Sequence, residues 1–392
     1  MKIAVYNPNL KILGGGEKYS CTIAEVLGAE HDVHLLSHDE HVSKNQIEER
    51  LNVDLSNVKI AYLPKFQNVD INYKVLGVPR ILKYYKDRKK YGSEFQKNYD
   101  LFVNITVTEP FFCNSRNGIL HVQFPFDLHP SKIRRGFHKL PQYLYYSFEW
   151  WKRINSYRCI VVNSNFTKFW LKKRWNVDSI VLYPPVDTNR SRIDRRKKKV
   201  ILSVGRFFVG GHSKKQHLMI SPFKDLFLDG FKDWELHLIG GVVNNDKDQE
   251  YLKKLQFEAQ GYPIFFHINI PFTEVRKYYE ESSIFWHATG YGENEEEHPE
   301  KMEHFGMTTV EAMNAGCVPV VINRGGQPEI VRQNIDGYLW DSLEELKNYT
   351  KLLADDEEAL RSMSESCKKR SQYFGKEVFR KRLLEIVREV NK

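Results

Sequence analysis

Long apolar runs are missing from this chain of 392 residues. No stretch reaches the roughly 18 apolar residues of a membrane-spanning helix, so none is expected. The N-terminal segment has neither a long apolar core nor a small-residue cleavage site, and we expect no secretory signal peptide. The five cysteines are scattered and form no Cys-x-x-Cys pair, which argues against a disulfide framework and against a zinc site. A cytoplasmic location is therefore expected.

Positive charge, in contrast, is abundant in the first half of the chain. Residues 1–200 carry 34 Lys and Arg against 19 Asp and Glu, whereas residues 201–392 carry 25 against 31. The change of sign supports a division into two domains, which the chain length also favours. It also predicts that the first half meets an anionic partner.

Strand and helix patterns occur twice in the same order. An apolar run at Lys2–Asn7 is followed by three glycines, a helical pattern over Glu17–Leu27 and a second strand at His31–Ser37. Strand, turn, helix and strand form a βαβ unit. After the charge run Arg190–Lys199, the apolar strand Val200–Val204 opens the same series again. Two Rossmann-like domains in series are therefore expected.

The expected boundaries follow from these patterns. Residues 1–190 form the first domain and residues 191–375 the second. The tail 376–392 carries apolar residues at helical spacing and is predicted to be an amphipathic closing helix.

The segment Glu303–Ile330 is the most informative part of the sequence. It predicts a loop, a helix over Met307–Asn314, a buried strand over Val318–Ile322, and a second helix start after two glycines. Helix N-termini at the carboxyl ends of parallel strands bind anions. Carboxylates beside such a site, here Glu303 and Glu311, suit hydrogen bonds from sugar hydroxyls.

The spacing of these carboxylates resembles a family signature. Glu303, seven intervening residues and Glu311, with Phe305 and Gly306 between them, resemble the E-x7-E motif of GT-B glycosyltransferases of family 4. The resemblance implies a GT-B fold, in which two Rossmann-like domains face each other across a cleft and the C-terminal helix returns to the first domain.

Further motifs extend the resemblance over most of the chain. Arg206 resembles the family's diphosphate-binding arginine, and Lys214 its partner, with Lys215 as the near alternative. His121, in the sequence HVQFP, is similar to the family's active-site histidine, and residues 14–17 (GGGE) to its glycine loop. The combination is nearest to mannosyltransferases that extend lipid-linked oligosaccharides.

The resemblance implies retaining transfer of a hexose, with mannose as the favoured guess, from a nucleotide-diphosphate sugar to a saccharide or lipid-linked acceptor. It also implies that residues 1–190 bind the acceptor and residues 191–375 the nucleotide sugar. No metal and no further cofactor are implied. The implied catalytic residues are His121, Arg206, Lys214 and Glu303. The implied donor-binding residues are Gly15, Gly16, Arg206, Lys214, Phe305, Gly306, Met307 and Glu311. Within this set Glu311 is assigned to the ribose and Glu303 to the hexose.

Cationic and aromatic residues interleave over residues 131–158, and a shorter run of this kind covers residues 83–90. Such a surface suits anionic lipid head groups at the cytosolic membrane face. An ordinary amphipathic helix that packs its aromatics against the sheet explains the pattern equally well. Single-stranded nucleic acid is a weaker reading.

Three other functions compete with hexosyl transfer. A nucleotide-sugar epimerase with the same fold would need no acceptor, and a nucleic-acid-binding protein would use only the basic first half. A dehydrogenase would use the glycine loop together with Asp39, but Tyr19 stands where its fingerprint has a third glycine. Asp246 and Asp248 resemble a metal-binding Asp-x-Asp pair, although we interpret their polar surroundings as a solvated loop.

Overall fold

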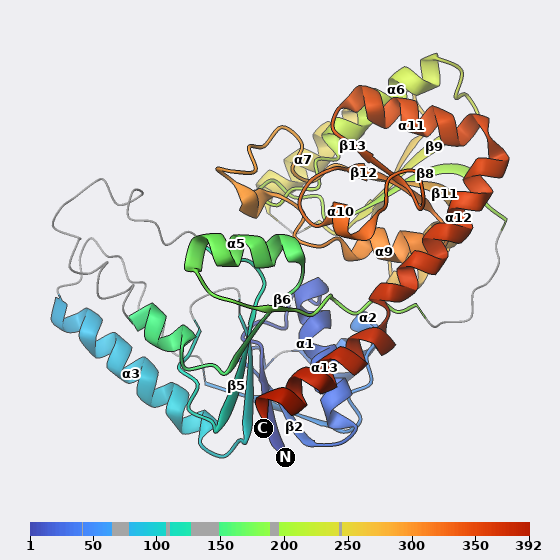
Figure 1. Ribbon diagram of the computed structural model, residues 1–392. Helices are drawn as coiled ribbons and strands as arrows, with labels where there is room; N and C mark the ends of the chain where they lie inside the picture. Colours follow the sequence, from blue (N-terminus) through green and yellow to red (C-terminus); the bar gives the residue numbers. More distant parts are fainter. Residues whose placement is uncertain (41, 65–77, 107–109, 127–148, 189–195, 243–244) are drawn as a thin grey trace. The chain divides into compact units, whose positions relative to one another are not determined.

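The structure is a computed structural model that describes residues 1–40, 42–64, 78–106, 110–126, 149–188, 196–242 and 245–392. The chain divides into two compact units, each built around one parallel sheet with helices (Figure 1). The first unit comprises Met1–Asn163, Thr167–Leu182 and Arg380–Lys392, and the second comprises Ser164–Phe166 and Tyr183–Phe379. The two-sheet fold expected from the sequence is confirmed.

The first unit contains a seven-stranded sheet of order β3-β2-β1-β4-β5-β6-β7, in which every paired strand is parallel. Its elements are β1 (Lys2–Tyr6), α1 (Gly15–Gly28), β2 (Asp32–Ser37), α2 (Lys44–Leu51), β3 (Val58–Tyr62), α3 (Val78–Gln96), β4 (Leu101–Thr106), β5 (Asn117–Val122), β6 (Cys159–Val162), α5 (Asn165–Trp175) and β7 (Ile180–Val181). Strands buried on both faces explain the continuous apolar runs, because helices cover each side of a parallel sheet.

The second unit repeats this architecture with the order β10-β9-β8-β11-β12-β13. Its elements are β8 (Lys198–Val204), α6 (His217–Leu228), β9 (Glu235–Gly240), α7 (Asp246–Glu258), β10 (Ile264–Ile268), α8 (Phe272–Glu281), β11 (Ser282–His287), η3 (Pro299–Lys301), α9 (Met307–Asn314), β12 (Val318–Ile322), α10 (Gln327–Ile330), β13 (Tyr338–Trp340), α11 (Leu343–Asp355), α12 (Glu357–Ser371) and η4 (Gln372–Phe374), and the last helix, α13 (Lys376–Val390), begins in this unit and continues into the first. In both sheets the strand order reverses beside the first strand, which is the point where doubly wound sheets bind ligands.

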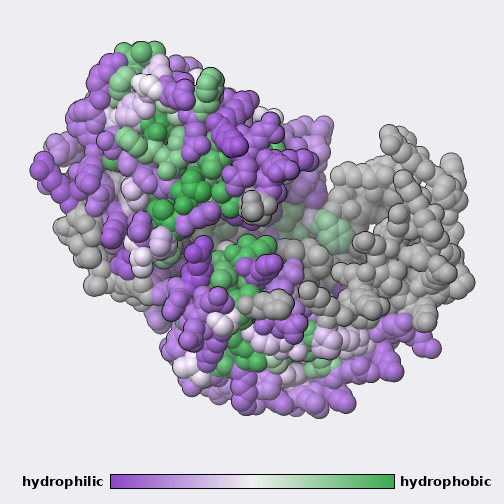
Figure 2. Space-filling view, turned by 180° about the vertical axis from the view of Figure 1, so that it is seen from behind, coloured by the Kyte–Doolittle hydropathy of each residue, from purple (hydrophilic) through white to green (hydrophobic). Residues whose placement is uncertain are grey.

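The closing helix α13 is amphipathic, as predicted. The five apolar residues of its predicted face are all buried: Phe379, Leu383, Ile386, Val387 and Val390. From Arg380 onward the helix belongs to the first unit, where Asn391 accepts a hydrogen bond of 2.9 Å from Nδ2 of Asn117. The chain therefore ends in the unit in which it began. In Figure 2 hydrophilic residues make up much of the coloured surface, and hydrophobic residues show between them in patches.

The charge run over residues 190–199 extends into the strand that was expected to begin only at Val200. Residues 189–195 lie outside the described part, but β8 already begins at Lys198. Lys198 and Lys199 start the strand as exposed residues, and they form ion pairs with Glu281 and Asp233 respectively. The charged run therefore includes the first two residues of β8 as well as part of the segment that precedes the strand.

Candidate active site

The candidate site of the second unit lies at the reversal point between β8 and β11, which pair in parallel. The segment after β8 carries Arg206 and Lys214, and the segment after β11 leads to Glu303 and helix α9. Parallel strands place these segments at the same edge of the sheet. The predicted position at the carboxyl ends of strands is therefore confirmed for the second unit.

Glu303 is the centre of a buried charged cluster. Its side chain is 10% exposed, and its Oε2 accepts hydrogen bonds from the ammonium of Lys214 and from Nε2 of His287, the latter at 3.0 Å. His212 lies further away, with Nε2 3.7 Å from Oε1 of Glu303. Burial alone would raise the pKa of Glu303, but the Lys214 ammonium and the two histidines hold it well below its usual range. Glu303 is therefore an ionised carboxylate and not a member of a solvated acidic loop.

Backbone packing fixes the loop that carries Glu303. The N–H of Gly326 donates to the carbonyl of Glu303 at 2.7 Å. A β-carbon at Gly326 would stand 2.6 Å from the carbonyl oxygen of His304, closer than side chains approach. The two glycines predicted to open the next helix therefore serve close backbone contact, and they hold the Glu303 loop in one position.

The two neighbouring lysines have different partners. Lys214 pairs with Glu303, whereas Lys215 pairs with Glu293 at 2.6 Å. Lys301 also binds Glu293, at 2.7 Å. The structure thus brings Lys214 to the predicted sugar-binding carboxylate and ties Lys215 to the loop that follows β11.

Arg206 follows β8 and is exposed, with its guanidinium 5.4 Å from the ring centroid of Phe208. In the part of the chain that the structure describes, its side chain has no ion pair, so the charge is available to an anion. Unlike Lys214, Arg206 does not join the Glu303 cluster.

Helix α9 begins with the predicted glycine. Gly306 precedes the helix with a φ of 116°, a left-handed conformation that glycine adopts without strain. The first helical hydrogen bond closes from the N–H of Thr309 to the carbonyl of Gly306 at 3.0 Å. The N–H groups of Met307 and its successor precede this bond and offer donors to an anion. Phe305 is buried at 3% exposure and anchors the helix start in the core.

Glu311 lies one turn into α9, as predicted. It accepts a hydrogen bond of 3.2 Å from the hydroxyl of Tyr279, a residue of α8. Burial, and then the negative charge of Glu311, raise the pKa of Tyr279 well above its ordinary value, so the phenol remains a donor. The contact fixes one carboxylate oxygen of Glu311.

In the first unit, the glycine loop and His121 occupy the start of α1 and the end of β5. Gly15 opens α1, and a β-carbon at Gly16 would stand 2.8 Å from Nε2 of Gln123. The His121 ring is 2% exposed and stacks on Tyr19 at a centroid distance of 4.2 Å. Neither ring nitrogen of His121 has a hydrogen-bond partner among the described residues. Burial lowers the pKa of His121 to about 3, so the ring is neutral.

Asp39 serves the backbone of its own unit. Its Oδ2 accepts N–H bonds from Leu10 at 2.7 Å and from Lys11 at 3.0 Å, which fixes the loop after β1. Both contacts join the segment after β2 to the loop after β1. The acidic residue that imitated a dinucleotide fingerprint therefore has a structural use.

The expected solvated loop around Asp246 and Asp248 is wrong. Both residues lie in the first turn of α7, where side-chain carboxylates are favoured by the helix dipole. Asp248 is 5% exposed and accepts from the N–H of Val209 at 2.9 Å and from Nδ2 of Asn245 at 2.6 Å. The described residues contain no group of three or more His, Cys, Asp or Glu side chains arranged to hold a metal ion.

Two histidines of the Glu303 cluster were missed by sequence reasoning. His287 ends β11, sixteen positions before Glu303, and His212 lies in the loop before Lys214. No short motif joins them to Glu303, because the sheet and not the local sequence brings these loops together. Only a prediction that β8 and β11 are neighbouring strands could have placed these histidines near Glu303.

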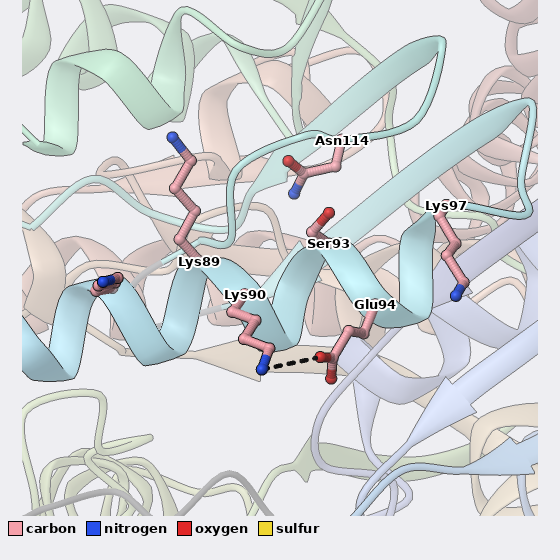
Figure 3. A pocket seen from close by; sticks show the side chains of 7 residues that line it. Lys89, Lys90, Ser93, Glu94, Lys97 and Asn114 are labelled. Atoms are coloured by element: carbon pink, nitrogen blue, oxygen red, sulfur yellow. Dashed lines mark ion pairs between the residues drawn. The ribbon is translucent and has the colours of Figure 1, made fainter.

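A second polar surface lies on α3 of the first unit. A pocket on this helix is lined by Lys86, Lys89, Lys90, Ser93, Glu94, Lys97 and Asn114. Figure 3 shows Lys89 and Lys90 projecting from the helix on different sides, with Lys90 directed toward Glu94 at 3.9 Å. The opposite side of α3 is anchored, because Arg88 is buried with its guanidinium 4.3 Å from the ring centroid of Phe111. The buried contact of Arg88 therefore fixes the orientation of α3, so that its lysines face away from the core.

The predicted aromatic and basic segment 131–158 is described only from residue 149. Residues 131–148 lie outside the described part. Trp150 is buried against Trp175, and Arg153 is buried at 1% exposure, as the packed-helix interpretation requires. Trp151 is 37% exposed. Among the helices that the structure describes, none is long and apolar enough to cross a membrane.

Comparison with known proteins places this site in context. Residues 186–370 match the family model described as "Glycosyl transferases group 1", and residues 13–190 match "Glycosyltransferase Family 4". The GDP-Man:Man(3)GlcNAc(2)-PP-Dol alpha-1,2-mannosyltransferase of Xenopus tropicalis is 32% identical over 203 residues. That alignment covers 47% of this chain and 38% of the relative, so the chain spans well under half of the relative's length.

Solved structures match nearly the whole chain. A glycosyltransferase from Rickettsia africae has a TM-score of 0.69 at 16% identity, with 100% of this chain and 98% of that one covered. The Anabaena protein Alr3699/HepE, solved with UDP and glucose, has a TM-score of 0.68 at 16% identity, with 99% and 100% covered. At these identities the similarity supports the fold alone.

Proposed function

Because the chain belongs to the group 1 and family 4 glycosyltransferases, we propose that it transfers a hexose from a nucleotide-diphosphate sugar to a saccharide or lipid-linked saccharide acceptor. The observation that carries this proposal is the juxtaposition at the edge of the second sheet. Cations and free helix N–H groups lie beside two carboxylates there. A diphosphate joined to two sugars presents the matching anions and hydroxyls.

The chemistry of transfer needs charge stabilisation at the leaving group. When the hexose leaves, negative charge develops on the diphosphate. We assign its stabilisation to Arg206, Lys214 and the amides that open α9, without a divalent metal. We assign the ribose hydroxyls to Glu311 and the hexose to Glu303 and the backbone of Phe305.

In the first unit we assign the close approach of backbone to phosphate to Gly15 and Gly16, and a contact with the transferred sugar to His121. The His121 assignment is supported by its ring nitrogens, which have no hydrogen-bond partner among the described residues, since a neutral imidazole can donate to one hydroxyl and accept from another. Acceptor binding by this unit and retention of configuration stay predictions from the family resemblance, and the cytoplasmic location stays a prediction from the sequence.

Mannose is the favoured hexose and GDP the favoured nucleotide. Support comes from the name of the Xenopus relative, which specifies a GDP-Man donor and a lipid-linked acceptor. A lipid-linked acceptor would bring the first unit to a membrane surface. The basic pocket of α3 suits that contact, because exposed lysines attract anionic lipid head groups.

A thermal-shift panel tests the donor assignment. The full chain is heated with GDP, UDP, ADP and dTDP, and with NAD and a short oligonucleotide as controls. Binding to the native state raises the midpoint, so one diphosphate is expected to give a selective shift. A shift with NAD or the oligonucleotide alone would refute the proposal. The selected sugar nucleotide is then tested for transfer in the presence of EDTA.

Vesicle co-sedimentation tests the membrane assignment. Lys86, Lys90 and Lys97 are changed together to Glu, and the matched control changes the exposed residues Lys253, Lys277 and Lys381 in the same way. Both variants have the same net charge. We expect only the α3 variant to lose sedimentation with vesicles containing phosphatidylglycerol, and neither protein to bind pure phosphatidylcholine. Equal loss in both variants would show that net charge, and not α3, directs binding.

A further inference from the structure

Lys214 has two roles that compete. In the structure its ammonium is paired with Glu303, and both side chains are largely buried. In the proposed function, on which this inference rests, Lys214 also neutralises the donor diphosphate. As Lys214 turns toward the phosphates, Glu303 loses much of its compensating charge inside the protein. A buried carboxylate without partners takes up a proton, and a protonated carboxyl is a poorer acceptor for sugar hydroxyls.

His287 is placed to prevent that outcome. It ends β11 inside the sheet, is 2% exposed, and its backbone is held by pairing of β11 with β12 at Val321. Its Nε2 lies 3.0 Å from Oε2 of Glu303 and 3.3 Å from the hydroxyl of Thr289. A histidine fixed by a central strand does not need to move when a ligand arrives.

The surroundings of His287 also determine which ring nitrogen carries the proton. A carboxylate only accepts hydrogen bonds, so the proton must sit on Nε2. Nδ1 is buried and has no partner among the described residues, so a second proton there would have no acceptor. Burial lowers the pKa of His287, although Glu303 opposes this effect. The ring is therefore a neutral Nε2–H donor.

We propose that His287 is a positioning residue that holds the Glu303 carboxylate ionised and in place while Lys214 engages the donor diphosphate. The sugar portion of the donor then meets a carboxylate that is ready to accept its hydroxyls. His287 touches neither donor nor acceptor and acts through Glu303.

Four basic groups face Glu303 in the described structure. Lys214 and His212 come from the segment after β8, His287 from β11, and His304 from the loop of Glu303 itself. Burial, assisted by the nearby His212, lowers the pKa of His304 to about 3, so its charge does not change between pH 5 and 8. The third imidazole that faces Glu303, that of His212, stands beyond hydrogen-bond distance, with Nε2 3.7 Å from Oε1 of Glu303.

The test separates sugar binding from diphosphate binding. Isothermal titration measures the affinities of the full chain for GDP and GDP-mannose, with UDP and UDP-glucose in parallel, from pH 5 to 8. The ratio of the two affinities is the contribution of the sugar. His287→Leu removes the donor, and His287→Gln retains an N–H donor. His212→Ala is the matched control, because it removes an imidazole without removing a hydrogen bond to Glu303.

We expect His287→Leu to lower the ratio by about tenfold at pH 7, as for loss of one hydrogen bond to a charged group. The loss should deepen toward pH 5, where the unsupported carboxyl becomes protonated, and GDP affinity should stay within about twofold of the wild type. His287→Gln should keep most of the ratio, and His212→Ala should lower it less than His287→Leu does, because His212 acts on Glu303 from 3.7 Å. If His287→Leu does not fold, the more adaptable His287→Met carries the same test.

Two results would overturn the inference. One is a leucine variant that keeps the wild-type ratio at every pH, including the case in which its affinities for GDP and GDP-mannose fall equally. The other is an equal loss of the ratio in the leucine and glutamine variants, which indicates a merely structural role. If the wild type binds no nucleoside diphosphate, the proposed function fails, and the inference fails with it. If the wild type binds a nucleoside diphosphate but the His287 variants behave otherwise than expected, only the role of His287 is refuted.

Discussion

The ion pair between Lys214 and Glu303 makes a quantitative prediction about stability. Lys214→Ala removes the ammonium and leaves the carboxylate in place, Glu303→Gln removes the carboxylate, and the double variant removes both. Their side chains are 18% and 10% exposed. Breaking a buried pair from one side costs about 3–5 kcal/mol, because the remaining charge is left uncompensated. Since Glu303 keeps its bond from His287, we expect Lys214→Ala to lower the free energy of unfolding by about 3 kcal/mol at pH 7.

The double-mutant cycle isolates the pair. Because the double variant leaves no buried carboxylate, its destabilisation should be smaller than the sum of the single effects by about 2 kcal/mol. Urea unfolding followed by tryptophan fluorescence gives the free energies. Lys215→Ala is the control, because its partner Glu293 retains the ion pair with Lys301 and is more exposed than Glu303. The control should cost about 1 kcal/mol or less.

The pH dependence of this cycle has a definite sign. The folded-state pKa of Glu303 lies well below the usual value, because Lys214 and the histidines outweigh the effect of burial. Its ionised form therefore contributes stability above the unfolded-state pKa of about 4.3, and the contribution is lost as the pH falls further. The effect of Lys214→Ala should shrink below about pH 4. Single effects that add within about 0.5 kcal/mol at pH 7 would refute the assignment of a coupled buried pair.

The remaining predictions concern activity. Glu311→Ala should abolish most transfer while the protein still folds, with a lower thermal midpoint because the buried hydroxyl of Tyr279 loses its acceptor, and wild-type turnover would refute the ribose assignment. Arg206→Ala should weaken binding of the nucleoside diphosphate by about tenfold or more in titration calorimetry, as expected for a lost bond to a charged group. Gly306→Ala places a β-carbon 2.5 Å from Nε2 of Gln327 at a φ of 116°, so the free energy of unfolding should fall by about 1–3 kcal/mol in the same urea assay. Treatment with EDTA should leave transfer unchanged, whereas a reversible loss would return Asp246 and Asp248 to consideration.

Much of the fold could be predicted because its signals are local. The strand β12 is five consecutive buried residues, and Gly306 and Gly316 bracket α9 with positive φ values of 116° and 78°. Apolar runs and glycines report buried strands and helix ends directly. The charge run before β8 misled in one respect, because exposed lysines can begin a strand as well as form a connection.

The site could be predicted only in part, for a related reason. Glu303 and Glu311 lie on one continuous segment, so their distance is visible in the sequence. The choice between Lys214 and Lys215 is not visible there, since it depends on packing across β8. A β-carbon at Gly205 would collide with the aliphatic stem of Lys214. The glycine therefore lets this stem cross the end of the strand, while Lys215 takes a positive φ of 56° and turns to Glu293.

The ionised state of Glu303 depends on residues from distant parts of the chain. A carboxylate at that depth is stable only with several donors, and the donors come from two segments separated in sequence by some seventy residues or more, after β8 and at the end of β11. Those segments meet only because the strand order reverses between them. The residues that recognise a ligand can thus be found by motif, but the residues that keep them charged must be found by topology. His287 belongs to no motif and reaches Glu303 only through its position at the end of β11. Its variants therefore measure how much of the proposed sugar recognition depends on a residue that the sheet supplies.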